Sequence, residues 1–132
     1  GENVRDWLYV EDHADALVQI VSRGRSGEKY NVGGGNERRN IDVVRRICEI
    51  LDDLRPDGAP HERLVEFVDD RPGHDARYAI DATKLESEFG WRAGETFETG
   101  IEKTVRWYVD NEWWWRPLRE KVYHGERLGF VA

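Results

Sequence analysis

One short segment of the sequence, Asp70 to His74 (DRPGH), places an arginine, a carboxylate and an imidazole within five positions. The guanidinium of Arg71 is a planar donor fork suited to phosphate or carboxylate oxygens. Pro72 and Gly73 favour a tight turn, which presents polar groups from a fixed backbone. An ordinary surface turn, in which Asp70 and Arg71 pair weakly in solvent, is the alternative. The residue types therefore indicate a candidate anion-binding loop.

Two further positions have chemistry of the same kind. Arg5 stands at the head of a β-rich run, where it is either an anion ligand or an ordinary strand-edge arginine. Asn40 precedes an apolar periodic run and is a good N-cap, and a helix N-terminus can offer donors to a ligand oxygen. Glu11, Asp12 and His13 match no metal-ligand spacing, and helix capping by Asp12 explains that cluster adequately.

The glycine turn within YNVGGGNERRN, residues 30–40, has the layout of a dinucleotide-phosphate loop. Placing the first two glycines of that fingerprint on Gly33 and Gly35 puts Arg38 where a third glycine must allow close helix packing. No strand-end acid follows about 20 residues later, and no Gly-Lys-Ser/Thr completes a Walker loop. The pattern favours a plain strand-to-helix turn over a cofactor site.

The aromatic segment WYVDNEWWW, residues 107–115, resembles a stacking platform for bases or sugars. Trp107 and Tyr108 fall on a predicted helix, so at least one of them is expected in the core. Trp113 to Trp115 fit an interface or ordinary packing equally well, and we leave the tail beyond Arg116 unassigned.

Hydrophobic periodicity predicts helices alternating with short strands, hence the α/β class, and the length of 132 residues fits one domain or a piece of one. Strands are expected at residues 4–10, 28–32, 64–68 and 77–80. Helices are expected from about residue 13 to 23, from 41 to 54, up to Phe89, and from 97 through 108. Their expected N-caps are Asp12, Asn40, Asp81 and Thr96, and Gly24 and Gly90 are expected to end two of them.

Composition limits the possible functions. The net charge of −7 and the pI near 5.1 argue against nucleic-acid and anionic-membrane binding, and no apolar run approaches the length of a membrane span. Arginines outnumber lysines sixteen to four, so an anionic ligand would be held by a few placed guanidinium groups. The single Cys48 and the lack of a signal-peptide pattern predict a cytoplasmic location. The lack of methionine suggests a piece of a longer protein.

Four stretches together resemble the dTDP-glucose 4,6-dehydratases of the extended short-chain dehydrogenase/reductase family. They are RDWLYVEDHADAL (5–17), GEKYNVGGGNERRNIDVV (27–44), DRPGHDARYAID (70–81) and FGWRAGETFETGIEKTVRWYVDNEWWW (89–115). The first is shared more loosely by nucleotide-sugar epimerases and decarboxylases, whereas the last two are more specific to the dehydratases.

The resemblance implies the C-terminal, sugar-nucleotide-binding portion of an enzyme that converts dTDP-glucose to its 4-keto-6-deoxy product by NAD-mediated oxidation, water elimination and re-reduction. NAD would be bound by an N-terminal Rossmann domain outside this chain, and the parent enzyme would be a homodimer. By matching motifs, Arg5 contacts the nucleotide diphosphate and Asn40 the substrate. The loop that closes over the nucleotide comprises Asp70, Arg71, Pro72, Gly73 and His74, with Arg71 as the phosphate ligand.

The catalytic parts of that family have no match in these residues. The GxxGxxG cofactor loop is missing, and none of the five tyrosines is followed four places later by lysine. The chain alone is therefore expected to be inactive. Two alternatives stay open: a fragment of a related nucleotide-sugar epimerase or decarboxylase, and a non-catalytic interaction module that uses the aromatic tail.

Overall fold

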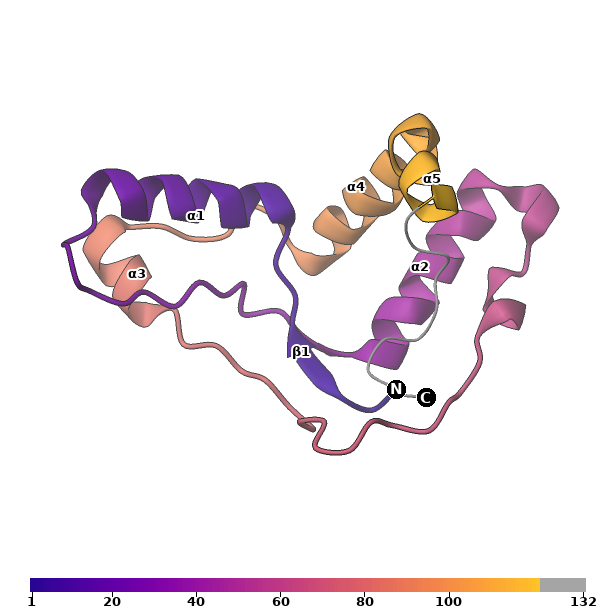
Figure 1. Ribbon diagram of the computed structural model, residues 1–132, viewed down its shortest axis with the longest axis horizontal. Coiled ribbons are helices and arrows are strands. Elements are labelled where there is room, and N and C mark those ends of the chain that lie inside the picture. Colours follow the sequence, from indigo (N-terminus) through magenta and orange to yellow (C-terminus); the bar gives the residue numbers. More distant parts are fainter. Residues whose placement is uncertain (122–132) are drawn as a thin grey trace.

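The computed structural model describes residues 1–121, which form an elongated arrangement of helices around a small strand pair (Figure 1). Helices α1 and α3 lie at one end of the molecule and α2 and α5 at the other, with α4 between them. The segment 65–80 runs as an extended chain along the lower edge. The elements in order are β1 (Val4–Asp6), α1 (Val10–Arg23), β2 (Glu37–Arg39), α2 (Asn40–Leu54), the 3-10 helices η1 (Pro56–Gly58) and η2 (His61–Leu64), α3 (Thr83–Phe89), α4 (Phe97–Asp110) and α5 (Glu112–Lys121).

The strand β1 is bonded on both of its edges. On one edge it pairs antiparallel with β2. On the other, the Val4 N–H donates to the Ala76 carbonyl at 2.8 Å and the Tyr78 N–H donates to the Val4 carbonyl at 3.0 Å, which forms a parallel bridge to Arg77. The extended segment after the DRPGH loop is thereby fixed beside β1, although about seventy residues separate them in the chain. The antiparallel register is Val4↔Arg39, Arg5↔Arg38 and Asp6↔Glu37.

The glycine turn is held by the side chain of Asp6. The carboxylate accepts hydrogen bonds from the Gly34 N–H at 3.0 Å and the Asn36 N–H at 2.8 Å. A Cβ on Gly33 would lie 2.6 Å from that carboxylate, and Gly35 has a φ of +63°, so glycine is required at both positions. The sequence predicted that the turn leads directly into a helix. In the structure the turn leads into β2, and the helix α2 follows that strand.

One of the four predicted helix caps is confirmed. Thr96 caps α4 in a reciprocal capping box with Thr99. At α3 the N-cap is Ala82, one residue after the predicted Asp81, although the Asp81 carboxylate accepts from the Thr83 N–H at 2.9 Å. The predicted end of α3 is confirmed, since the helix ends at Phe89 before Gly90 in the left-handed region (φ +69°).

The starts of α1 and α2 were also predicted wrongly. Helix α1 begins at Val10, three residues early, so Asp12 lies inside its first turn; the Asp12 carboxylate instead accepts from the N–H groups of Gly94 and Glu95, each at 3.0 Å. At α2 the N-cap is Arg39, because β2 runs straight into the helix. Asn40 is the first helical residue, and its N–H donates to the Asn3 carbonyl at 2.9 Å.

The predicted strands are largely not formed in residues 1–121. The segments 28–32 and 64–68 have no strand partner, β1 stops at Asp6, and residues 77–80 contribute a single bridge. A strand exists only when a neighbouring strand accepts and donates its main-chain hydrogen bonds. The overall pattern of helices with short strands agrees with the predicted α/β class.

The buried core is small and divided. One cluster lies between α1 and α3 and is formed by Ala16, Leu85 and Trp91. A second set of buried side chains lies on α2 and α4, which pack together: Ile41, Val43, Ile50, Phe97 and Val105. The expectation that Trp107 or Tyr108 is core was wrong, since these side chains are 44% and 51% exposed. No helix in residues 1–121 is long and apolar enough to cross a membrane.

Replacing Asp6 with alanine should destabilise the fold by about 2 kcal/mol, because two backbone N–H groups would lose a charged acceptor. Denaturant unfolding followed by circular dichroism measures this change. Asp110→Ala is the matched control, since Asp110 is an exposed acid at the end of α4. Equal stability of the two variants would show that the carboxylate does not hold the turn.

Candidate functional site

The side chain of Arg5 is the centre of the polar groups that the fold brings together. It projects from β1 toward the segment that follows the DRPGH loop. Its Nη2 donates to His74 Nε2 at 2.7 Å and to the Asp75 carbonyl at 2.8 Å, while its Nη1 donates to the Val4 carbonyl at 2.6 Å. Three of its five N–H groups are thereby engaged, and two remain for a ligand.

The partners of His74 indicate its tautomer. A guanidinium can only donate, so His74 Nε2 must accept the hydrogen bond from Arg5. The proton of the neutral ring then lies on Nδ1, which donates to Asp70 Oδ1 at 2.7 Å. The resulting chain, Asp70 to His74 to Arg5, links both ends of the loop to β1. Within it, the His74 hydrogen bond holds the pKa of Asp70 below its ordinary value.

The tip of the loop, Arg71 to Gly73, is exposed to solvent. The Arg71 N–H donates to Asp70 Oδ1 at 2.8 Å, and Gly73 has a φ of +71°, which closes the turn around Pro72. The side chains of Arg71 and Pro72 are exposed. Within residues 1–121 the Arg71 guanidinium has no hydrogen bond or ion pair, so it is available to an anion.

Asn40, the first residue of α2, lies near the DRPGH loop. With Asp70 and His74 it lines a cavity of about 530 Å³ between α2 and the segment 64–70, whose wall includes Leu51 and Phe67. Its Oδ1 is buried and lacks a hydrogen-bond partner among the described residues. Such an acceptor is stabilised when a donor, for example a ligand hydroxyl, reaches it.

The fold therefore brings Arg5, Asn40, Asp70 and His74 together, with Arg71 on the exposed rim. Cys48 lines the same cavity, and burial raises the pKa of its thiol, which argues against a nucleophilic role.

Two residues near Arg5 were not found by sequence reasoning. The ring of Tyr78 lies against the Arg5 guanidinium, 4.4 Å from ring centroid to Cζ. The Tyr78 hydroxyl donates to the Asp75 carboxylate. Both residues lie within the DRPGHDARYAID stretch, but nothing in the sequence indicates a contact with Arg5, which is about seventy positions away.

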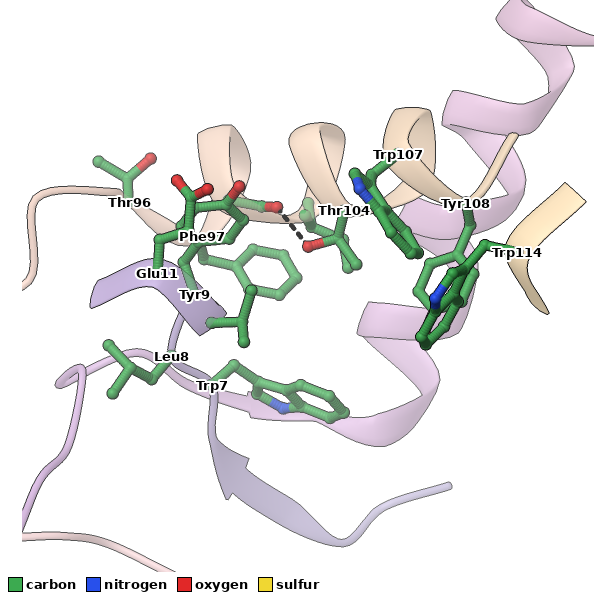
Figure 2. Close-up of a pocket in the computed structure, with 13 residues that line it drawn as sticks. Trp7, Leu8, Tyr9, Glu11, Thr96, Phe97, Thr104, Trp107, Tyr108 and Trp114 are labelled. Atoms are coloured by element: carbon green, nitrogen blue, oxygen red, sulfur yellow. Dashed lines mark hydrogen bonds between the residues drawn. The ribbon is translucent and has the colours of Figure 1, made fainter. Parts of the chain in front are cut away.

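A second cavity, of about 540 Å³, is lined mainly by aromatic and aliphatic side chains (Figure 2) and shares no lining residue with the cavity at Asn40. It lies between the β1–α1 connection and α4, with Trp7 on one wall, Trp107 and Tyr108 on the other, and Trp114 of α5 at its end. Among the described residues that line it, Glu11 alone is charged. The two cavities are of similar volume, and the polar one is the better ligand site, because a binding site needs convergent polar groups and these surround Arg5.

The glycine turn does not fit a dinucleotide. The N–H groups of Gly34 and Asn36 that would face a pyrophosphate are already bonded to the Asp6 carboxylate, and this negative charge would repel the ligand. No group of three or more His, Cys, Asp or Glu side chains in residues 1–121 is arranged to hold a metal ion, and Glu11, Asp12 and His13 form no such site.

Comparison with known proteins defines the class. The chain belongs to the GDP-mannose 4,6 dehydratase family, whose model matches residues 1–104.

Within that class, its sequence relatives are dTDP-glucose 4,6-dehydratases. It is 68% identical over 131 residues to a probable dTDP-glucose 4,6-dehydratase of Sinorhizobium fredii and 58% identical over 135 residues to a dTDP-glucose 4,6-dehydratase of Escherichia coli. Each match covers 99% of this chain and 37% of the relative, so the chain spans little more than a third of their length. The predicted resemblance is confirmed.

Solved structures give the same result. The dTDP-glucose 4,6-dehydratase of Bacillus anthracis in complex with NAD matches with a TM-score of 0.75 and 47% identity, over 89% of this chain and 35% of that one. DesIV, a dTDP-glucose 4,6-dehydratase of Streptomyces venezuelae with NAD bound, matches with a TM-score of 0.76 and 40% identity, over 89% and 34%. These matches confirm the fold as part of an extended short-chain dehydrogenase/reductase.

The Asp70 carboxyl should titrate below its ordinary pKa of 3.8, because the hydrogen bond from His74 favours the ionised form. A folded-state pKa below the unfolded one means that this contribution to stability is present above pH 3.8 and is lost as the pH falls through the folded value. Carboxyl-carbon NMR measures the titration.

In the His74→Ala variant the Asp70 pKa should rise toward 3.8. His13→Ala, an exposed histidine on α1, is the control and should leave it unchanged. An Asp70 titration that ignores the loss of His74 would contradict the hydrogen-bond chain.

Proposed function

We propose that this chain is the C-terminal, sugar-nucleotide-binding portion of a dTDP-glucose 4,6-dehydratase. The observation that carries the proposal is that Asn40, Asp70 and His74 line one cavity and that Arg5 is hydrogen-bonded to His74. These are the positions at which the family resemblance implies substrate contacts. The relatives, which are dTDP-glucose 4,6-dehydratases by name, support the same substrate.

Each residue of the site has a role that follows from its chemistry. Arg71 is exposed and unpaired among the described residues, so it is the phosphate ligand at the rim. Arg5 supplies its two remaining N–H donors to the diphosphate, and Asn40 Oδ1 accepts from a sugar hydroxyl. His74 and Asp70 keep Arg5 in place, and Pro72 with Gly73 shapes the loop that closes over the nucleotide.

The chemical steps belong to residues outside this chain. The parent enzyme oxidises the glucose at C4, eliminates water across C5 and C6, and returns the hydride to C6, with NAD as the hydride carrier. NAD would be held by an N-terminal domain, since the glycine turn of this chain does not fit a pyrophosphate. No tyrosine in these 132 residues has a lysine four places later, so we expect no turnover by the chain alone.

The exposed apolar face of α1 supports a partner domain in the same polypeptide. One face of the helix packs on the core through Ala16, while the opposite face presents Val10, Leu17, Val18 and Val21, the last of which is 86% exposed. A contiguous apolar face of this kind marks an interaction surface. We propose that the remainder of the polypeptide covers it. The parent is further proposed to be a cytoplasmic homodimer that binds neither nucleic acid nor membrane.

The complete polypeptide that contains this sequence should bind and convert dTDP-glucose in preference to UDP-sugars. Kinetics on a panel of dTDP- and UDP-sugars, with product identified by mass spectrometry, tests this. A preference for a UDP-sugar would instead support a related epimerase or decarboxylase. Full activity of the 132-residue chain alone would contradict the assignment of catalysis to residues outside it.

In the complete polypeptide, Arg71→Gln should weaken dTDP binding about tenfold or more, because a hydrogen bond to a charged group contributes about 1.5–3 kcal/mol. Titration calorimetry measures the dissociation constant. Arg119→Gln, which removes an exposed arginine on α5, should leave it unchanged. Equal affinities of the two variants would remove Arg71 from the site.

Val21→Glu should act differently in the two contexts. In the 132-residue chain the exposed position should tolerate the charge within about 0.5 kcal/mol. In the complete polypeptide the same change should destabilise by at least about 2 kcal/mol, since it would bury an unpaired charge. Gln19→Glu, a polar position of the same helix, is the control for both measurements of unfolding free energy. No difference between the two contexts would show that the α1 face stays uncovered.

A further inference from the structure

The aromatic ring of Tyr78 restricts the guanidinium plane of Arg5. Cζ of Arg5 lies 4.4 Å from the ring centroid, within the range in which a cation is attracted to an aromatic face. A stacked ring leaves the in-plane N–H donors free and blocks only the face of the group. Tyr78 is 48% exposed, so this contact is made at the surface of the site and not in the core.

The orientation of the Tyr78 ring is fixed in turn by Asp75. The Tyr78 hydroxyl donates to the Asp75 carboxylate, which raises the pKa of Tyr78 and keeps the hydroxyl protonated. The main-chain carbonyl of Asp75 accepts from Arg5 Nη2 at 2.8 Å. Asp75 therefore bonds both to Arg5 and to the tyrosine whose ring lies against Arg5, and the three residues form a closed set of contacts. The bridge between Val4 and Arg77 fixes the backbone on which this set is built.

We propose that Tyr78 and Asp75 are positioning residues that hold the Arg5 guanidinium in the plane required to bind a nucleoside diphosphate. This inference rests on the proposed function of the site. His74 and the Asp75 carbonyl fix one nitrogen of the guanidinium, while the stacked ring fixes its tilt. Without the ring, Arg5 retains its charge and its main-chain acceptors but samples more orientations, so its remaining donors meet the ligand less often.

The test measures dTDP binding to the complete polypeptide by calorimetry in a double-mutant cycle of Tyr78→Leu and Arg5→Met. Tyr78→Leu should weaken binding about two- to fivefold, as expected for a surface cation–π contact. Tyr78→Phe keeps the ring but loses the hydrogen bond to Asp75, so its affinity should fall between those of wild type and Tyr78→Leu. In the Arg5→Met background, Tyr78→Leu should have no further effect, because there is no guanidinium left to orient.

Two controls separate positioning from general loss of structure. Tyr108→Leu removes a tyrosine of similar exposure on α4, away from Arg5, and should leave dTDP affinity unchanged. Binding of thymidine, which lacks phosphate, should be the same in wild type and Tyr78→Leu.

Additive losses in the cycle would overturn the positioning role and leave the proposed function standing. So would a Tyr78→Leu variant with wild-type affinity beside a weakened Arg5→Met variant. Unchanged dTDP binding in Arg5→Met itself would overturn both, since Arg5 would then lie outside the ligand site.

Discussion

A guanidinium donates hydrogen bonds and accepts none, and the surroundings of Arg5 follow from this constraint. The acceptors come from three places: the carbonyl of Val4 on its own strand, the ring nitrogen of His74, and the carbonyl of Asp75. Because Arg5 must donate to His74 Nε2, the proton of the neutral imidazole lies on Nδ1. This Nδ1–H donates to the Asp70 carboxylate. One arginine thus organises the loop that is proposed to close over a nucleotide.

The strand β1 makes this arrangement possible, although it has only three residues. Its main chain is bonded to β2 on one edge and to residues 76–78 on the other, so two segments far apart in the chain meet across it. Closing such a loop costs conformational entropy, which the backbone hydrogen bonds and the Arg77–Glu37 ion pair help to offset. The end of β1 is secured by Asp6, whose carboxylate holds the glycine turn.

The distribution of apolar groups explains why these 121 residues look incomplete as a folded unit. Buried side chains form two small groups, whereas α1 and the aromatic cavity beside α4 leave large apolar side chains in solvent. The orphan N–H of Trp7 in the wall of that cavity has no acceptor among the described residues. These features agree with a chain that spans about 37% of the length of its dehydratase relatives.

The sequence by itself determined the features that depend on neighbours along the chain. The capping box of Thr96, the left-handed stop at Gly90 and the extents of α2 and α4 are local, because the groups that satisfy each other lie within a few residues. The candidate residues Arg5, Asn40 and those of the DRPGH loop were also recognisable, since their types and motifs carry chemistry without reference to a fold. Their roles as ligand contacts remain predictions.

Only the tertiary structure decided which distant groups meet. The strand expected at residues 28–32 is not formed because a strand needs a partner that the sequence pattern does not supply. The Asp12 carboxylate, predicted as a cap, instead accepts from the N–H groups of Gly94 and Glu95, which are 82 and 83 positions away. The contacts of Tyr78 and Asp75 with Arg5 also join residues about seventy positions apart, so the tertiary structure determines them. A hydrogen bond depends on distance in space, and residue type alone does not fix that distance when the partners are far apart in the chain.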